Sequence, residues 1–286
     1  MSAKPIAAAT VLAAAVLLAA PAQAGLFKRN KPDTPPASAA KPAPKAGLDT
    51  AREAPRKATA EERAAAQRSE PLARMAFWSR EFDLDAQDAE AGAALSAALR
   101  ALGRFGEATE VAERALTLKP GHLDSLLELA RAQIARNQGF YAIEPARKAQ
   151  TAAPKDWRAP SLLGVAYEQV GRGTEARAAW EQALRLSPDN PAVLANMAMA
   201  MATTGDLPGA EALLRRAAAQ KGAGVKVRQN LVLVLGLQGK MQEAERLARE
   251  DLPPEVASAN LDWLRSASAG GHRSWDAMKD RTTATN

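Results

Sequence analysis

The chain has 286 residues, of which 47% are hydrophobic and only 4% aromatic, so its core must be built mainly from alanine and leucine. It contains no cysteine, which excludes disulfides, cysteine-ligated metals, thiol nucleophiles and a lipidated N-terminal cysteine. The formal net charge is +6, but residues 25–57 alone hold eight basic and three acidic side chains, and Lys4 adds one more positive charge. The remaining chain is neutral, which argues against a nucleic-acid-binding surface.

Residues 1–24 have the pattern of a secretory signal peptide. Lys4 supplies the positive start, an apolar run follows, and Ala-Gln-Ala at the end matches a cleavage site, so the mature chain would begin at Gly25. The alternative is an uncleaved membrane anchor, but the apolar run has roughly 15 residues where a spanning helix needs about 20. We therefore expect export, which in a bacterium means the periplasm.

Residues 25–57 are rich in proline, alanine and lysine, a composition typical of a disordered linker. One interpretation is a basic arm that makes peripheral contact with anionic lipid headgroups or peptidoglycan. The alternative, which we favour, is a soluble spacer.

Residues 58–88 are predicted to form two short helices. Glu61 and Glu62 suit the first turn of one helix, where the helix dipole favours acidic side chains. The second helix is expected from Pro71 to Phe82, with proline in its first turn. This segment does not follow the spacing of the residues after it, and we interpret it as a degenerate or capping repeat.

From residue 89 onward the chain repeats with a period of 34 residues. A small residue stands eighth in four of five windows, and glycine or asparagine stands fifteenth in all five. Proline stands at position 32 in the first three windows. The five windows are 89–122, 123–156, 157–190, 191–224 and 225–258, and their twentieth residues are Ala108, Ala142, Ala176, Ala210 and Ala244.

These positions predict one helix–turn–helix unit for each window. Small residues let the two helices approach, a residue that tolerates a left-handed backbone ends the first helix, and proline stops the second. The spacing is that of the tetratricopeptide repeat (TPR). The sequence therefore predicts an all-α TPR solenoid, a right-handed superhelix over residues 89–258.

The fifth repeat is expected to be truncated. Its second helix should run from about Met241 to Glu250, because two prolines follow at 253 and 254. A last helix, beginning near Glu255 and ending within residues 259–269, would cover the open end of the stack. Residues 270–286 are predicted to be a flexible tail.

The sequence offers no catalytic, cofactor-binding or metal-binding constellation, so we expect a non-enzymatic protein without cofactor or metal. The two histidines are far apart in the chain, and we interpret His122 as an exposed residue of a turn between repeats and His272 as part of the tail. The repeats and their caps also leave no room for a second, catalytic domain.

What remains is a binding surface, because the first helices of TPR units line a concave groove. Stacked amides at the sixth position of successive repeats can hydrogen-bond an extended peptide. The alternative is that they are ordinary polar residues on a solvated face. Val165, Met199 and Leu233 add an apolar component, although they also suit packing. The polar candidates are Arg100, Arg131, Arg158, Glu168, Gln169, Asn196, Gln229 and Asn230.

Residues 225–265 read VKVRQNLVLVLGLQGKMQEAERLAREDLPPEVASANLDWLR and are followed by Arg273-Ser274-Trp275. This segment resembles TadD-like TPR proteins of bacterial Flp/Tad pilus assembly. The resemblance implies an envelope protein needed to build or localise the pilus secretion machine. Members are often outer-membrane lipoproteins that act on the secretin ring, whereas this chain has Ala-Gln-Ala-Gly in place of a lipidated cysteine. A soluble periplasmic role, or association with the outer membrane through a partner, is therefore implied.

The expected function is a periplasmic scaffold or adaptor for pilus assembly and secretion, with a secretin or another Tad component as partner and no nucleic acid. The alternative is a general TPR adaptor for another envelope complex, in polysaccharide export or peptidoglycan synthesis. A further rival is an enzyme with repeats appended.

Overall fold

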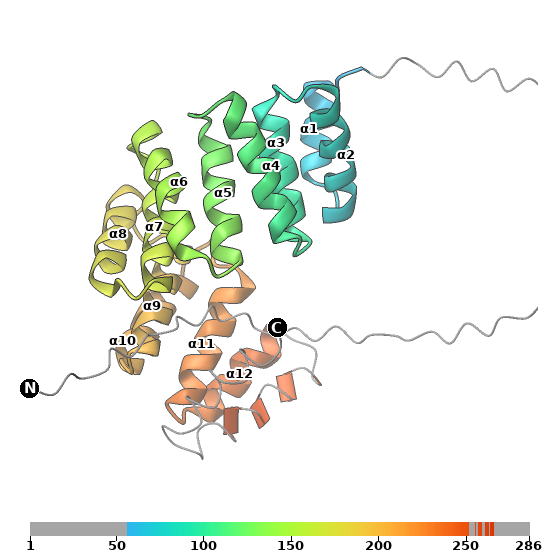
Figure 1. Cartoon of the computed structure of the whole chain (residues 1–286). Helices are drawn as coiled ribbons and strands as arrows, with labels where there is room; N and C mark the ends of the chain where they lie inside the picture. The colour runs from blue at the N-terminus through green and yellow to red at the C-terminus, as the bar shows by residue number, and fades with distance from the viewer. Residues whose placement is uncertain (1–55, 252–254, 256, 259–260, 263, 266–286) are drawn as a thin grey trace, which may run out of the picture. The chain divides into compact units, whose positions relative to one another are not determined.

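The structure is a computed structural model that describes residues 56–251, 255, 257–258, 261–262 and 264–265. Over these residues the secondary structure consists of α-helices, with no strand (Figure 1). The expected signal peptide, the linker up to residue 55 and the tail lie outside the described residues.

Each 34-residue window contains one pair of helices, which we call helix A and helix B of that repeat. The predicted all-α TPR solenoid is thereby confirmed. Before the first window, α1 spans Ala60–Gln67 and α2 spans Pro71–Leu84. The five repeats are α3 (Ala89–Ala101) with α4 (Phe105–Leu118), α5 (Leu123–Ala135) with α6 (Gly139–Ala152), α7 (Arg158–Gln169) with α8 (Gly173–Leu186), α9 (Pro191–Thr203) with α10 (Leu207–Ala218), and α11 (Val225–Leu237) with α12 (Met241–Asp251).

The turns form where the sequence predicts them. The fifteenth residue has a positive φ in all five repeats, which explains why glycine or asparagine stands there. Helix B ends two residues before the proline in each of the first three repeats. The residues with positive φ are Gly103 (76°), Asn137 (57°), Gly171 (75°), Gly205 (91°) and Gly239 (77°).

Helices A and B of one repeat approach closely because small residues face each other. The alanine at position 20 is fully buried in every repeat. In the third repeat Gly164 of α7 lies under the ring of Trp180 of α8, and a Cβ on Gly164 would come within 2.3 Å of Trp180 Nε1. In the first repeat Ser96 fills the same position, and its hydroxyl donates to the carbonyl of Ala108 at 2.8 Å.

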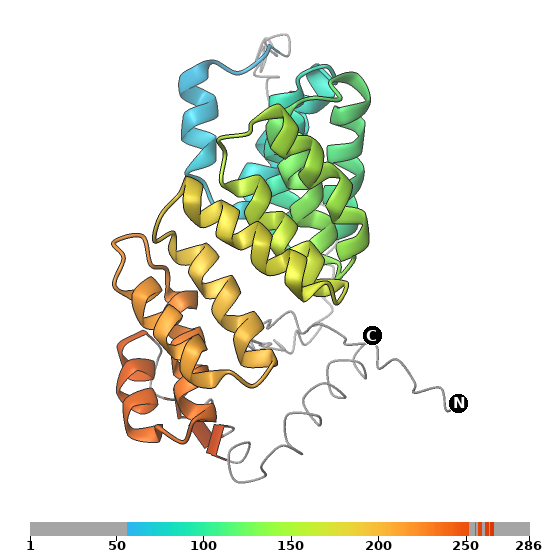
Figure 2. The same cartoon turned by 90° about the vertical axis from the view of Figure 1, so that its left-hand side faces the viewer.

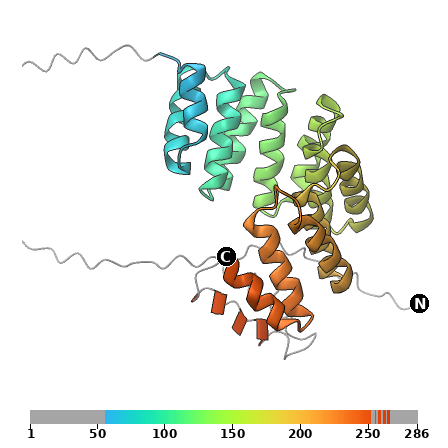
Figure 3. The same cartoon turned by 180° about the vertical axis from the view of Figure 1, so that it is seen from behind.

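The A helices lie on the inner side of the stack. Each A helix contacts helix A of the next repeat, whereas the B helices of neighbouring repeats do not contact one another in the described part of the chain. The first four B helices instead pack between their own A helix and the next one. The succession of pairs can be followed from the blue α1 to the orange α12 in Figures 2 and 3.

At the N-terminal end, α1 and α2 precede the first repeat. Trp78 and Phe82 of α2 are almost completely buried and join the core of the first repeat. Arg63 of α1 reaches across to Glu81 at 3.1 Å and to Asp88 at 2.6 Å, which holds α1 on α2. The helix expected to end at Phe82 continues to Leu84.

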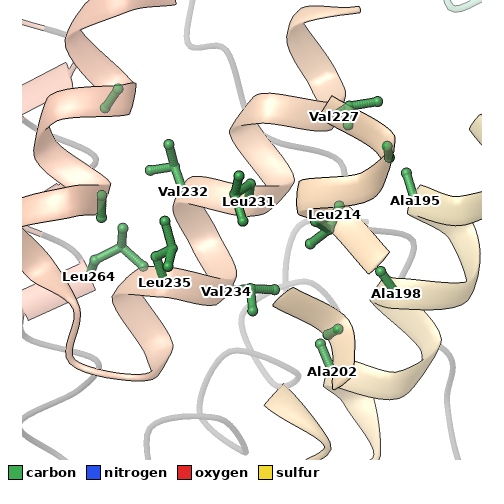
Figure 4. Close-up of a cluster of buried hydrophobic side chains, with 14 of the residues drawn as sticks. Ala195, Ala198, Ala202, Leu214, Val227, Leu231, Val232, Val234, Leu235 and Leu264 are labelled. Carbon is green, nitrogen blue, oxygen red and sulfur yellow. The ribbon is translucent and has the colours of Figure 1, made fainter. Parts of the chain in front are cut away.

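At the C-terminal end, the described residues between 255 and 265 are helical and pack on the last repeat. Leu264 lies against Gly236 of α11, where a Cβ would be 2.7 Å from Leu264 Cδ1. Figure 4 shows Leu264 beside Leu235, while Leu214 of α10 lies between α9 and α11. Val256 and Trp263, also expected in this helix, lie outside the described residues.

Glu211 of α10 links the fourth repeat to the fifth. Its carboxylate accepts hydrogen bonds from Lys240 at 2.5 Å, Gln238 at 2.7 Å and Arg215 at 2.9 Å. Lys240, the largest cause, together with Arg215 and Gln238, lowers the pKa of Glu211 to about 2 although burial of the carboxyl group opposes this. Lys240 and Gln238 belong to the turn between α11 and α12, so the contact fixes how α11 sits on α10.

We expect Gly164→Ala to lower the free energy of unfolding by about 1–3 kcal/mol, because the added methyl group would overlap the Trp180 ring. Gly106→Ala is the matched control, because a Cβ on Gly106 of α4 would meet nothing within 4 Å. This control should raise the same free energy by a few tenths to about 1 kcal/mol through helix propensity. Urea unfolding followed by circular dichroism measures both, and equal values for the two variants would contradict the close approach of α7 and α8.

We expect Glu211→Gln to lower the free energy of unfolding at pH 7 by about 1–2 kcal/mol, since Lys240 and Arg215 are nearly half exposed and solvent screens them. A lowered carboxyl pKa stabilises the fold above the unfolded value near 4.5, and this contribution is lost as the pH falls towards about 2. The difference between wild type and variant should therefore be constant from pH 7 to about 5.5 and shrink below 4.5. Glu181→Gln is the control, because it changes an exposed carboxylate on α8 that forms no ion pair with another described residue, and it should leave the free energy of unfolding at pH 7 unchanged.

Candidate functional site

The A-helix face consists of the side chains at positions 2, 5, 6, 9, 12 and 13 of the five A helices. All the polar side chains predicted for a groove lie on these helices and are half-buried, so they border the core without being enclosed by it. Their surroundings differ strongly from repeat to repeat. The face therefore divides into parts with different chemistry, which follow from the contacts of each side chain.

In the first two repeats the charged side chains neutralise one another. Glu128 of α5 is 6% exposed and lies between two arginines. Arg100 of α3 donates to Glu128 at 3.0 Å, and Arg131, one turn further along α5, donates to its other oxygen. Arg131 is thus already paired within the protein, and its predicted contact with a ligand stays a prediction.

Arg158, at the start of α7, is likewise paired. It donates to Asp156 Oδ1 at 3.1 Å and to Asp156 Oδ2 at 2.6 Å, and it also donates to Asp124 of α5 at 3.1 Å. These hydrogen bonds from Arg158 lower the pKa of Asp156, and they also raise the pKa of Arg158. A ligand would have to displace one of these carboxylates to reach the guanidinium group.

Gln169 forms a contact between repeats. Its side-chain amide donates to the carbonyl of Ile134 at 2.9 Å, at the end of helix A of the preceding repeat. A Cβ on Gly139 would be 2.7 Å from Gln169 Cβ, so the two repeats meet closely here. This contact joins the second and third repeats. The role of Gln169 in partner binding stays untested.

Glu168, the neighbour of Gln169, is in a different situation. Its side chain is half-buried and forms no ion pair or hydrogen bond with any residue that the structure describes. Burial raises the pKa of Glu168, and no neighbouring group opposes this. The carboxylate lies near the start of α8, where a Cβ on Gly173 would be 3.9 Å from Glu168 Oε2.

Amide and apolar side chains predominate on the A-helix face in the fourth and fifth repeats, with Lys226 as the charged side chain of this part. Helix α9 carries no charged residue, and Asn196 is its one amide side chain. Gln229 and Asn230 follow on α11, and none of the three side chains forms a hydrogen bond with another described residue. Met199 and Leu233, each at position 9, are partly buried and pack against the core below them.

His122 differs from the expectation of an exposed turn residue. The structure places it at the N-terminus of α5, where Nδ1 accepts from the backbone N–H of Ser125 at 3.3 Å and lies 2.9 Å from the Ser125 hydroxyl. It is half-buried. Free N–H groups at a helix start favour such a side-chain acceptor, which explains why His122 points inward.

The sequence analysis missed one exposed aromatic pair. Phe140 and Tyr141, in the first turn of α6, are 72% and 63% exposed, and their rings meet edge to face. Other repeats have small or polar residues at these two positions. Phe140 and Tyr141 could therefore have been found in the sequence by comparing positions 18 and 19 of the five repeats.

The described residues were also compared with the requirements of a metal site and of a membrane-spanning helix. They contain no group of three or more His, Cys, Asp or Glu side chains arranged to hold a metal ion. No helix among them combines the length and the apolar character that crossing a membrane requires.

Comparison with known proteins supports the fold. Residues 169–231 match a family model described as tetratricopeptide repeat. The chain is similar to the crystal structure of a thermophilic TPR protein from Thermus thermophilus, with a TM-score of 0.54 and 22% identity over 61% of this chain and 94% of that one. It is also similar to MamA from Desulfovibrio magneticus RS-1, with a TM-score of 0.46 and 22% identity over 54% and 90% of the two chains. No match was found among curated proteins.

Proposed function

We propose that this TPR-fold chain is a non-enzymatic adaptor of the bacterial periplasm that binds a protein partner through its A-helix face. Within this role it would serve Flp/Tad pilus assembly and secretion, with a secretin or another envelope component as the partner. Partner binding is proposed from the side chains of the A-helix face. The role in pilus assembly is proposed from the resemblance of residues 225–265 to TadD-like proteins.

The observation that carries the proposal is the set of amides on α9 and α11. Asn196, Gln229 and Asn230 are half-buried, yet their side chains form no hydrogen bond within the described residues. An amide offers two donors and an acceptor, which match the carbonyl and N–H groups of an extended backbone. Asn196 and Asn230 stand at the same position of adjacent repeats, so they can bind two separate peptide groups along one extended ligand.

The family-like segment contributes to this same surface. Residues 225–265 include α11, which bears Gln229 and Asn230, together with α12 and the helical residues that pack on it. Two of the three amides thus belong to the segment that resembles pilus-assembly proteins. This supports the partner class, because the resemblance covers residues that reach the surface and not only the repeat core.

The proposed location follows from the signal peptide expected at residues 1–24 and the cleavage site before Gly25. The neutral charge of the chain beyond the linker suits a protein partner better than a nucleic acid. Residues 25–57 would act as a spacer that extends the reach of the repeats.

A crosslinked pull-down from the cell envelope tests the proposal, with the tagged wild-type chain, Asn196→Ala/Asn230→Ala and a control as baits. The control is Gln67→Ala/Gln242→Ala, which removes two exposed amides on α1 and α12. We expect a secretin or other pilus component with wild type and control. Recovery should fall about tenfold or more with the asparagine variant, since about 1.4 kcal/mol changes an equilibrium constant tenfold.

Equal recovery with all three baits would contradict binding through the A-helix face. Recovery of peptidoglycan synthases or polysaccharide exporter subunits instead would contradict the pilus assignment and favour the alternative envelope adaptor. Circular dichroism of each bait confirms that a loss of binding is not a loss of helix.

A further inference from the structure

The charged residues of the A helices are mostly paired with other residues of the chain. Two side chains of the A helices have no such partner among the described residues: Lys226, which is exposed in the first turn of α11, and Glu168, which is half-buried on α7. Arg228 of α11 donates to the carbonyl of Ala223 at 3.4 Å. The charges in ion pairs are Glu90, Arg100, Asp124, Glu128, Arg131 and Arg158.

Glu168 is the unusual member of this set because it is both unpaired and partly removed from water. Solvation of its charge is already weakened in the free protein, as the upward shift of its pKa through burial indicates. When a cation from solvent pairs with Glu168, less water therefore has to leave this carboxylate than would have to leave an exposed one. An ion pair at Glu168 therefore contributes more binding free energy than an ion pair between two exposed groups.

The surroundings of Glu168 indicate which residues would adjoin the cationic residue in a bound segment. On the preceding side, Ile134 of α5 is partly buried and its carbonyl is occupied by Gln169. On the following side, the next A helix has no charge and presents Asn196 and Met199. A bound segment would thus meet one carboxylate and then a surface of amide and apolar groups.

We propose that the A-helix face selects an extended peptide segment in which a lysine or arginine pairs with Glu168 while the adjoining residues are uncharged and apolar. This inference rests on the proposed function and deepens it by naming the chemistry of the partner. Charge complementarity supports a basic residue, because an acidic one would place two carboxylates together in a partly dehydrated site. The uncharged neighbours follow from the lack of any charge on α9.

The proposal is tested by selecting from a displayed library of 12-residue peptides, randomised at every position, against the chain purified from the cell envelope. Wild type should enrich lysine or arginine at one aligned position, next to apolar residues. Glu168→Gln should abolish that preference, and Glu168→Lys should convert it into a preference for aspartate or glutamate. Glu181→Gln, at an exposed unpaired carboxylate on α8 of the same repeat, should select as wild type does.

The best wild-type peptide should bind Glu168→Gln about tenfold more weakly or worse, because the amide keeps the shape of the side chain but lacks the charge that pairs with the peptide cation. Glu168→Gln should be folded, with a melting temperature at pH 7 equal to or above that of wild type. The reason is that burial raises the pKa of Glu168, so its charge opposes folding once the pH exceeds the ordinary value of 4.5.

The outcomes separate this inference from the proposed function. Peptides that lose binding in Asn196→Ala/Asn230→Ala but bind Glu168→Gln unchanged would overturn the inference and leave the function standing. Peptides that depend on Glu168 and not on the asparagines would support the inference and contradict the proposed amide contacts. Failure to select any peptide would contradict both.

Discussion

The close approach of the two helices within each repeat is the constraint on which the rest of the structure depends. In four of the five repeats it relies on a small eighth residue where helix A meets helix B, as Ser96 and Gly164 show. Among the described helices, successive A helices touch and successive B helices do not. The A helices therefore form the inner side, and their exposed positions become the surface available to a partner.

The fold could be predicted from sequence because its requirements are steric and recur at a fixed spacing. Positive φ at the fifteenth position, burial of Ala176 and its equivalents, and the end of helix B near proline in the first three repeats are local consequences of residue size and backbone freedom. The window spacing also identified which side chains lie on the A helices. None of this required knowledge of long-range contacts.

The pairing of those side chains could not be predicted in the same way. Position in the repeat does not reveal that Arg158 contacts Asp124, 34 residues earlier, or that Gln169 bonds to the carbonyl of Ile134. Such contacts depend on how far one repeat is rotated on the next, which the repeat pattern leaves open. For the same reason the sequence placed Glu168 with the arginines, whereas the structure separates the unpaired carboxylate from the paired guanidinium groups.

The A-helix face thus has two parts with different roles. In the first three repeats, ion pairs such as Arg100–Glu128 occupy the charged groups and join neighbouring repeats. Beyond Glu168 the surface carries Asn196, Gln229 and Asn230, whose side chains form no hydrogen bond with another described residue, together with apolar side chains and the exposed Lys226. The polar groups of the first repeats are hydrogen-bonded within the chain and stabilise the stack. The amides of the later repeats have no such partner and are available to a ligand.

The most direct test of binding through the A-helix face is nuclear magnetic resonance of methionine methyl groups during titration with the recovered partner. Met199 stands on this face at α9, whereas Met75 belongs to α2 and Met241 begins α12. Binding through the face predicts that the Met199 methyl signal shifts or broadens in proportion to the bound fraction while Met75 and Met241 stay unchanged. An unchanged Met199 signal at saturation, with a shift at Met75 or Met241, would contradict it.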